Sequence, residues 1–238
     1  MQTQVHLGEI VVDVVRKNIK NVHLSVHPPT GRVRIAAPEH MSLDVVRVFA
    51  ISKLGWIRRQ QHKLLEQERE TPREYLNRES HFLWGRRYLL AIHEKNQRPS
   101  VELEHSRIIL KVRSGADREK KESLLEEWYR MQVKDAVPPL IVKWERLIGV
   151  KVRGFFVQHM KTKWGSCNHH AGTIRLNTDL AKKPRECLEY IVVHEMVHLL
   201  EPTHNARFMA LMERFMPKWQ AHRDALNRFP VRHESWKY

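Results

Sequence analysis

Cysteine is scarce in this chain, and long apolar runs are missing. The 238 residues include 2 cysteines, Cys167 and Cys187, which are too few for a disulfide framework. The early apolar run at residues 10–15 is interrupted by Asp13, so we expect neither a secretory signal nor a membrane span. The expected location is therefore cytoplasmic, and the length suits one large domain or two small ones.

Acidic residues are also in the minority. The chain has 27 Asp and Glu against 42 Lys and Arg, which gives a net charge of +15. A positive field of this size favours anionic partners such as nucleic acid. The basic residues are spread along the chain, however, and no stretch alternates them with aromatic residues as a single-strand channel would. Association with nucleic acid is therefore a hypothesis from charge alone. We find no internal repeat.

The first 113 residues are expected to form a mostly antiparallel β region with one helix packed on it. Val22, Leu24 and Val26 alternate with polar neighbours, and the alternation resumes after a turn at residues 28–31. Ser42 is typical of a helix N-cap, and apolar residues follow it at helical spacing. Further strands are expected at residues 88–92, 101–103 and 108–112.

Residues 114–117 (SGAD) mark the expected boundary between two domains, at 1–113 and 114–238. The second domain is expected to open with a long helix that Pro138 and Pro139 kink or split. Short strands and further helices follow this helix in the sequence pattern. The predicted fold class is therefore α+β.

The segment HEMVHLLEPTH, which begins at His194, has the residue types and spacing of a zinc site. His194 and His198 are four residues apart, so a helix directs both side chains to one face. Glu195 lies one step round from that face, where it can reach a metal-bound water as general base. A break at Pro202 lets His204 return to the ion as a third ligand and leaves the fourth position open. An open position indicates a hydrolytic site rather than a structural one.

Chance does not readily explain this segment. Composition alone predicts about 0.09 HExxH matches, and under roughly one in a hundred once a further His at position 204 is required. Residues 188–200 are apolar nearly all round, which is typical of a buried helix. A buried glutamate with two histidines is costly without partners, and a metal ion supplies the partner.

The identity of the third ligand stays open at this point. His204 lies four residues before Phe208 and shares its inward helical face, which favours His204. Glu213 is the competing ligand, and Glu201 follows the turn too closely to be a good one. The spacing from His198 to His204 equals that of metzincins, but Glu201 holds their glycine position and no Met-turn is found. The pattern indicates a zincin-type site outside that group.

Two segments upstream complete the pattern. The run KTKWGSC ends at Cys167, and the run GTIRLN ends at Asn177. Together with EYIVVHEMVHL from Glu189 and the following His204, they resemble the YgjP-like metallopeptidases, which are zincin relatives of the SprT-type proteases. The resemblance covers most of the chain, and the early 26–56 region also looks like the family's N-terminal part.

This resemblance implies a zincin-like catalytic domain and a zinc-dependent hydrolase. Its expected site residues are the ligands His194, His198 and His204 and the catalytic base Glu195. It also implies that the strand containing Trp164, Gly165, Ser166 and Cys167 lies beside the cleft and contributes to substrate binding.

Peptide-bond hydrolysis is the first functional hypothesis, with Zn²⁺ as cofactor and a peptide or protein as substrate. Glu195 takes the proton of the water and later passes it to the leaving amine. A cation near the cleft, Arg207 or Lys163, is expected to stabilise the oxyanion. An extended substrate can add as a strand to a sheet edge near Trp164.

Other hypotheses belong to different classes. One is a DNA-associated accessory protein, either a protease of DNA-bound proteins or a protein with a vestigial site. Another is a metal-dependent amidase of small molecules. A structural zinc site made from Cys167, Cys187 and either His169 or His170 is disfavoured, because the paired C-x2-C spacing is absent.

Overall fold

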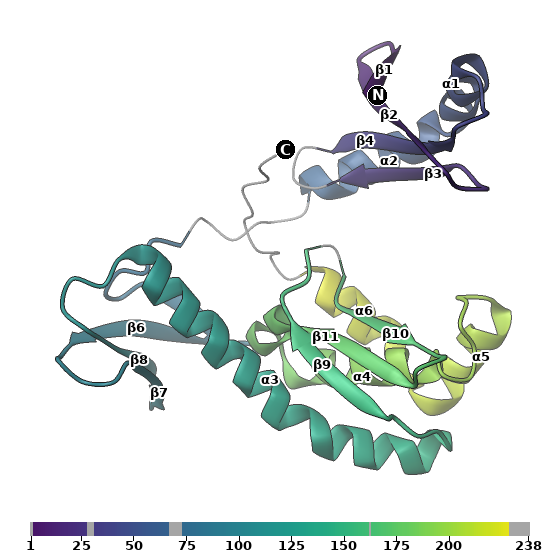
Figure 1. Cartoon of the computed structure of the whole chain (residues 1–238). Helices are drawn as coiled ribbons and strands as arrows, with labels where there is room; N and C mark the ends of the chain where they lie inside the picture. Colours follow the sequence, from purple (N-terminus) through teal and green to yellow (C-terminus); the bar gives the residue numbers. More distant parts are fainter. Residues whose placement is uncertain (1, 28–30, 67–72, 162, 229–238) are drawn as a thin grey trace. The chain divides into compact units, whose positions relative to one another are not determined.

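The computed structural model describes residues 2–27, 31–66, 73–161 and 163–228. The chain divides into two compact units, the first built from residues up to Pro72 and the second spanning Arg73–Phe229. Over the described residues it is a mixed α+β protein with six α-helices and three sheets (Figure 1). None of these helices combines the length and the apolar character needed to cross a membrane.

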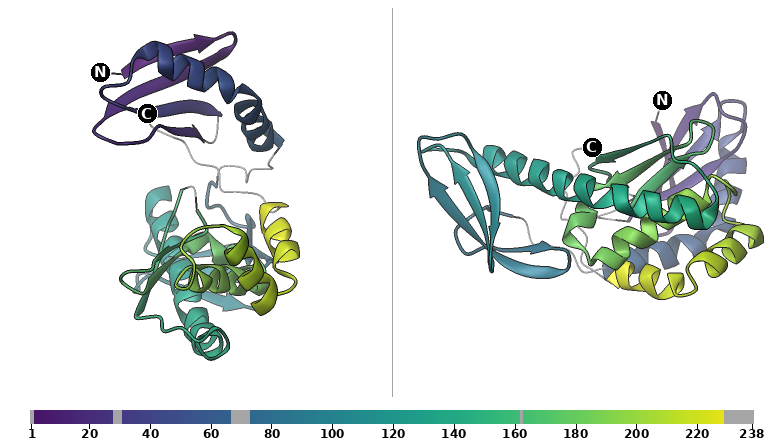
Figure 2. Two further views of the ribbon diagram at one scale, coloured as in Figure 1. Left: turned by 90° about the vertical axis from the view of Figure 1, so that its right-hand side faces the viewer. Right: turned by 90° about the horizontal axis from the view of Figure 1, so that it is seen from below.

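The first unit consists of one four-stranded sheet and two helices. Its strands are β1 (Gln2–Leu7), β2 (Ile10–Lys17), β3 (His23–His27) and β4 (Arg32–Pro38), in the order β1-β2-β4-β3. The helices α1 (Leu43–Ser52) and α2 (Leu54–Glu66) cover one face (Figure 2). The Ser42 hydroxyl accepts a hydrogen bond from the Val45 amide, so the predicted N-cap is confirmed. Two helices lie on this sheet, where the sequence predicted one.

A second sheet has the same topology as the first. Its strands are β5 (Ser80–Leu83), β6 (Arg86–Glu94), β7 (Ser100–Glu104) and β8 (Arg107–Val112), in the order β5-β6-β8-β7. In both sheets the two central strands are parallel and the outer pairs are antiparallel. The region is therefore mostly antiparallel, as predicted, but the central pair of each sheet is parallel, which the prediction did not include. The structure also contains a repeat of topology that the sequence did not show.

The boundary between the units lies at Arg73 and not between residues 113 and 114. Helix α3 (Arg118–Ile148) follows the second sheet, and its buried Leu125 and Tyr129 share one core with Leu90 and Ile108 of that sheet. Shared burial holds the second sheet in the same unit as α3. The helix runs through Pro138 and Pro139 without interruption (Figure 2).

The rest of the second unit positions the candidate site. A third sheet has the order β10-β11-β9, from strands β9 (Gly154–Gln158), β10 (Gly165–Asn168) and β11 (Thr173–Asn177). After the short 3-10 helix η1 (Thr178–Lys182) come the helices α4 (Arg185–Val197), α5 (Ala206–Phe215) and α6 (Trp219–Arg228). Helix α4 is central, because it contacts α3, α5, α6, η1 and the strands β10 and β11.

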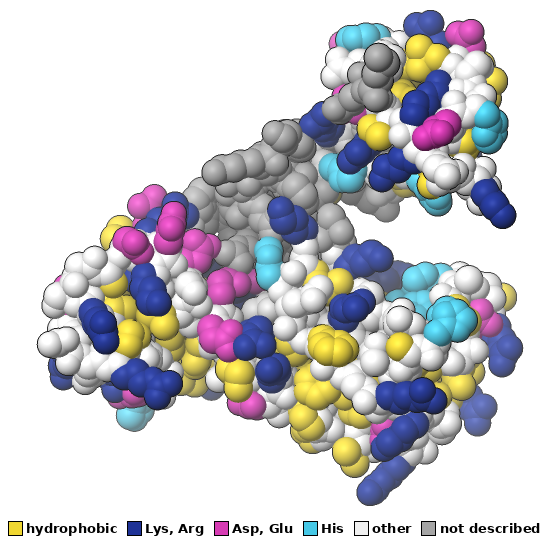
Figure 3. Space-filling view, in the orientation of Figure 1, with side chains coloured by type: hydrophobic (Ala, Val, Ile, Leu, Met, Phe, Trp, Pro, Cys, Tyr) yellow, Lys and Arg dark blue, Asp and Glu magenta, His cyan; other side chains and the backbone are white. Residues whose placement is uncertain are grey.

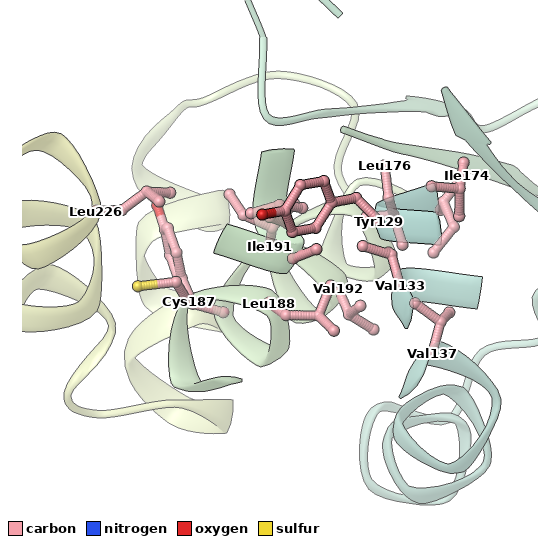
Figure 4. Close-up of a cluster of buried hydrophobic side chains, with 14 of the residues drawn as sticks. Tyr129, Val133, Val137, Ile174, Leu176, Cys187, Leu188, Ile191, Val192 and Leu226 are labelled. Atoms are coloured by element: carbon pink, nitrogen blue, oxygen red, sulfur yellow. The ribbon is translucent and has the colours of Figure 1, made fainter. Parts of the chain in front are cut away.

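The core around α4 is apolar. Figure 4 shows Leu188, Ile191 and Val192 of α4 among side chains from α3, β11 and α6. Burial on nearly all sides explains why this helix reads as apolar all round in the sequence. It also holds rigidly the last turn of α4, where the polar residues lie.

Candidate metal centre

Three histidines converge at the end of α4. His194 lies in the last turn of α4, and His198 is its C-cap residue. The chain then turns and enters α5, whose N-cap Asn205 accepts a hydrogen bond from the Phe208 amide. His204 immediately precedes this cap, so the start of α5 determines its position. The structure therefore brings together the three histidines that the sequence singled out.

The nitrogen atoms of these histidines are close enough to share one ion. One ring nitrogen from each of His194, His198 and His204 lies within 4.8 Å of the others. The Nε2 atoms of His194 and His204 are 3.0 Å apart. Burial and the two neighbouring imidazoles lower the pKa of His194 to about 3, so its ring is neutral, as a metal ligand must be. Three imidazoles are a donor set that suits zinc.

Two contacts hold the histidine rings in place. The His198 Nδ1 atom lies 3.0 Å from the carbonyl oxygen of Glu201, which leaves Nε2 directed at the other two rings. Phe208, which is fully buried, lies beneath all three rings, with centroid distances of 4.6 to 5.0 Å. Phe208 therefore forms an apolar floor that supports the histidine cluster.

Glu195 is the buried acid of this site. It is 4% exposed, and its carboxylate makes no hydrogen bond or ion pair with the described residues. Burial raises its pKa to about 8, against the opposing effect of the Lys163 charge. The backbone of β10 passes directly over it, because a Cβ added at Gly165 would lie 2.5 Å from the Glu195 Oε1 atom. Only glycine fits at this position.

A cleft of about 560 Å³ surrounds the cluster. It is lined by Lys163 and by four of the five residues that are expected to bind substrate, namely Trp164, Gly165, Ser166 and Cys167, but not by Arg207. Burial and the nearby glutamate raise the pKa of the Cys167 thiol to about 11, which argues against this cysteine as a nucleophile.

Arg207 does not line the cleft. Its side chain is 71% exposed and lies 4.0 Å from the Glu201 carboxylate, so its role at the oxyanion stays a prediction. Of the two cations predicted for this role, the structure places only Lys163 at the cleft.

The alternative ligands lie outside the histidine cluster. Glu213 is exposed and accepts a hydrogen bond from the Trp219 indole at 3.1 Å. Glu201 accepts a hydrogen bond from the Thr203 hydroxyl at 3.0 Å. Within the described ranges, Cys167 and Cys187 also form no ligand cluster with nearby histidines. The geometry therefore favours His204 as the third ligand.

Some residues at the cleft were missed by the sequence reading. Tyr190 and Arg223 line it, and a helical spacing of four residues from His194 could have identified Tyr190. Arg223 comes from α6, to which the pattern assigned no chemistry. Asn177 acts behind the cleft, because its side-chain amide donates to the carbonyl oxygens of Met160 and Lys163, at 2.7 and 2.8 Å.

Three converging imidazoles beside a buried carboxylate form the type of site found in metallopeptidases. The family model described as "YgjP-like, metallopeptidase domain" matches residues 20–229, and the chain therefore belongs to this family. The resemblance seen in the sequence is confirmed.

Comparison with curated proteins gives no match. Similar solved structures include the metallopeptidase zymogen of Pyrococcus abyssi abylysin, with 22% identity, a TM-score of 0.35 and coverage of 40% of this chain and 90% of that one. The metallopeptidase zymogen of Methanocaldococcus jannaschii jannalysin is similar at 21% identity, with a TM-score of 0.32 and coverage of 40% and 92%.

Proposed function

We propose that this protein is a zinc-dependent metallopeptidase that hydrolyses peptide bonds with Glu195 as general base. The observation that carries the proposal is the convergence of three histidine nitrogens within 4.8 Å, beside a buried glutamate in an open cleft. A zincin-like catalytic domain, with the HExxH motif on α4, is part of this proposal.

His194, His198 and His204 are proposed to hold the ion. The convergence of their ring nitrogens and the support from the Glu201 carbonyl and Phe208 fit a zinc site. A bound zinc ion supplies a Lewis acid that activates water and polarises the scissile carbonyl.

Glu195 is proposed to move the proton. Its carboxylate lies against the backbone of Gly165 and is not tied up in hydrogen bonds to the described residues, so it is available to a water in the cleft. It accepts the proton of the attacking water and then donates it to the departing amine. Lys163 lines the cleft, and its charge acts on Glu195, so this ammonium group is proposed to stabilise the oxyanion.

Strand β10 is proposed to hold the substrate backbone. It is an edge strand, because it pairs with β11 alone among the described strands of its sheet. Its residues Gly165, Ser166 and Cys167 line the cleft. An extended peptide can therefore pair with this edge through main-chain hydrogen bonds, which accept varied sequences.

Metal content and turnover test the proposal together. Purified protein is expected to hold one zinc ion per chain, and His204→Ala is expected to lose it, since two imidazoles bind zinc far more weakly than three. The control His93→Ala changes an exposed histidine of β6 and should retain the ion. Glu195→Gln should keep the zinc and lose peptide cleavage. Cleavage by Glu195→Gln at the normal rate would reject the assigned base.

Nucleic-acid association stays a prediction from the net charge of +15. Figure 3 shows Lys and Arg side chains distributed over the face in view, and not gathered in one groove. Binding to DNA measured over a range of salt concentrations tests this prediction, because phosphate contacts give a steep salt dependence. The small-molecule amidase hypothesis is tested by profiling peptide and amide substrates side by side.

A further inference from the structure

The charged residues of the cleft are unequal in number. Its lining contains two cations, Lys163 and Arg223, but one acid, Glu195. The proposed reaction already uses Lys163 and Glu195, which act on each other across the cleft floor. Arg223 is therefore a positive charge at the site for which the proposed mechanism has no use.

Arg223 lies close to the reacting groups. Helix α6 packs against α4, and Arg223 of α6 acts electrostatically on Tyr190 of α4. Tyr190 lies one helical turn before His194, and their rings are 5.8 Å apart. Arg223 therefore lines the same cleft as the three histidines, on the side of Tyr190.

The side chain of Arg223 is held ready for a ligand. Its guanidinium lies over the ring of Trp219 at 5.1 Å. Trp219 is buried, and its indole N–H donates a hydrogen bond to the Glu213 carboxylate. Its Nε donates to the Asp224 carboxylate at 3.0 Å. No bond to a described residue uses the terminal nitrogens, so four N–H donors remain for a ligand.

A carboxylate is the group that this arrangement fits. The planar guanidinium matches a carboxylate with two parallel hydrogen bonds, and stacking on Trp219 reduces the loss of side-chain freedom on binding. The pocket offers no second acid near Arg223 that would compete for it, apart from Asp224 on the same helix.

We infer that Arg223 is a specificity-determining residue that selects peptides with a carboxylate close to the scissile bond. The inference rests on the proposed peptidase function and names its substrate class. The carboxylate comes either from an acidic side chain or from a free C-terminus, and the experiment separates these sources.

The experiment uses the zinc-loaded full-length protein and pairs of quenched fluorescent peptides. Members of a pair differ only by Glu or Gln at one position, scanned through three positions on each side of the scissile bond. A further pair differs by a free or an amidated C-terminus. At one of these places kcat/KM for the carboxylate peptide is expected to be higher by about tenfold or more, the effect of one charged hydrogen-bonded pair.

Variants then assign the preference to Arg223. Arg223→Gln should reduce the ratio of kcat/KM within the selected pair to about one, and Arg223→Lys should restore part of it, since lysine keeps the charge but not the paired geometry. The matched control is Arg214→Gln on α5. Arg214 also lies over an aromatic ring, that of Phe215 at 5.5 Å, but does not line the cleft. The ratio of kcat/KM within the selected pair should be the same for Arg214→Gln as for the wild type.

Three results would overturn the inference. One is a wild-type enzyme that cleaves both members of every pair equally well. Another is an Arg223→Gln variant that slows both members equally and keeps their ratio, which indicates a structural role for the arginine. The last is a control variant that loses the ratio as well.

A failure of the proposed function has a different signature. In that case the wild type cleaves none of the peptides. Binding of the same pairs to Glu195→Gln, measured by calorimetry with and without Arg223→Gln, then decides the role of Arg223 independently of turnover. Equal affinity for both members of each pair in that experiment would also overturn the inference.

Discussion

The two units of this protein contain sheets of the same topology, but the buried acid of each unit has a different environment. Asp13 of the first sheet is 2% exposed, and its carboxylate is bonded to Arg32 and, at 3.0 Å, to Gln4. The Arg32 hydrogen bond is the main cause of the lowered pKa of Asp13. Glu195 is also buried but has no such partner among the described residues, and its pKa is raised to about 8. A buried acid with hydrogen-bond partners stabilises the fold, whereas a buried acid without them indicates a functional site.

The largest expected effect separates these two acids by their influence on turnover. Glu195→Gln should reduce kcat by about 10² to 10⁴-fold, the usual contribution of a general base. Asp13→Asn makes the same chemical change in the other unit and should leave kcat unaltered. Steady-state cleavage of one peptide by both variants measures the difference. Equal losses in the two variants would remove the distinction drawn here.

A second prediction concerns the space beside the buried glutamate. Gly165→Ala would place a Cβ 2.5 Å from Glu195 Oε1 and must displace the carboxylate, so kcat should fall by about tenfold or more. The control is Gly154→Ala in the same sheet, where a Cβ meets only Thr173 Cγ2 at 3.8 Å. Zinc content should be normal in both variants. Full activity of Gly165→Ala would show that the carboxylate position is not critical.

The third prediction concerns stability, where the substitution of Asp13 should have the larger effect and that of Glu195 the smaller. Asp13→Asn removes the charge of a buried acid that pairs with the partly exposed Arg32, and should lower the free energy of unfolding by about 1–3 kcal/mol. Glu195→Gln should cause no loss, because a neutral amide is easier to bury than a carboxylate. Hydrogen exchange at β2 and α4 measures each region separately. A stability loss at α4 in Glu195→Gln would mean that this carboxylate has a structural partner.

The pH dependence should sharpen the same contrast with a smaller effect. Because the pKa of Asp13 is lowered in the folded protein, its contribution is complete above the ordinary value of 3.8 and is lost as the pH falls through the folded value. The difference in unfolding free energy between wild type and Asp13→Asn should therefore shrink in acid. A difference that is constant down to the lowest pH would contradict the role of the ion pair.

The smallest effect is expected in the second sheet. Glu102 is exposed and pairs with Lys111 at 2.7 Å, and exposed ion pairs contribute little to stability. Glu102→Gln should therefore leave the unfolding transition where it is in the wild type. A clear shift of the transition would show that exposure is a poor guide to how much an ion pair contributes to stability.

Much of the candidate site could be predicted from the sequence, because local spacing determines it. The four-residue interval between His194 and His198 implies a shared helical face, and the apolar positions around Phe208 place His204 on the inward side. The N-cap at Ser42 is equally local. Each of these features depends on residues within one or two helical turns of each other.

Features that depend on distant residues could not be read in this way. Alternating residues indicate a strand but not the direction of its neighbour, so the parallel pairing of β2 with β4 was missed. The SGAD segment indicates a turn, but the shared core of Leu90 and Tyr129 decides which unit the strands join. Arg223 lies on a polar helix, and only its packing against α4 reveals its place in the cleft.

The third histidine lies in the connection between α4 and α5, and not on α4 with the first two. His204 precedes α5, while His194 and His198 belong to the end of α4, so an ion held by all three acts as a staple between two stretches of chain. Chelation should therefore loosen the start of α5 before the rest of the unit melts. Metal supply would then govern both the activity of this protein and the local order of the segment that bears its last ligand.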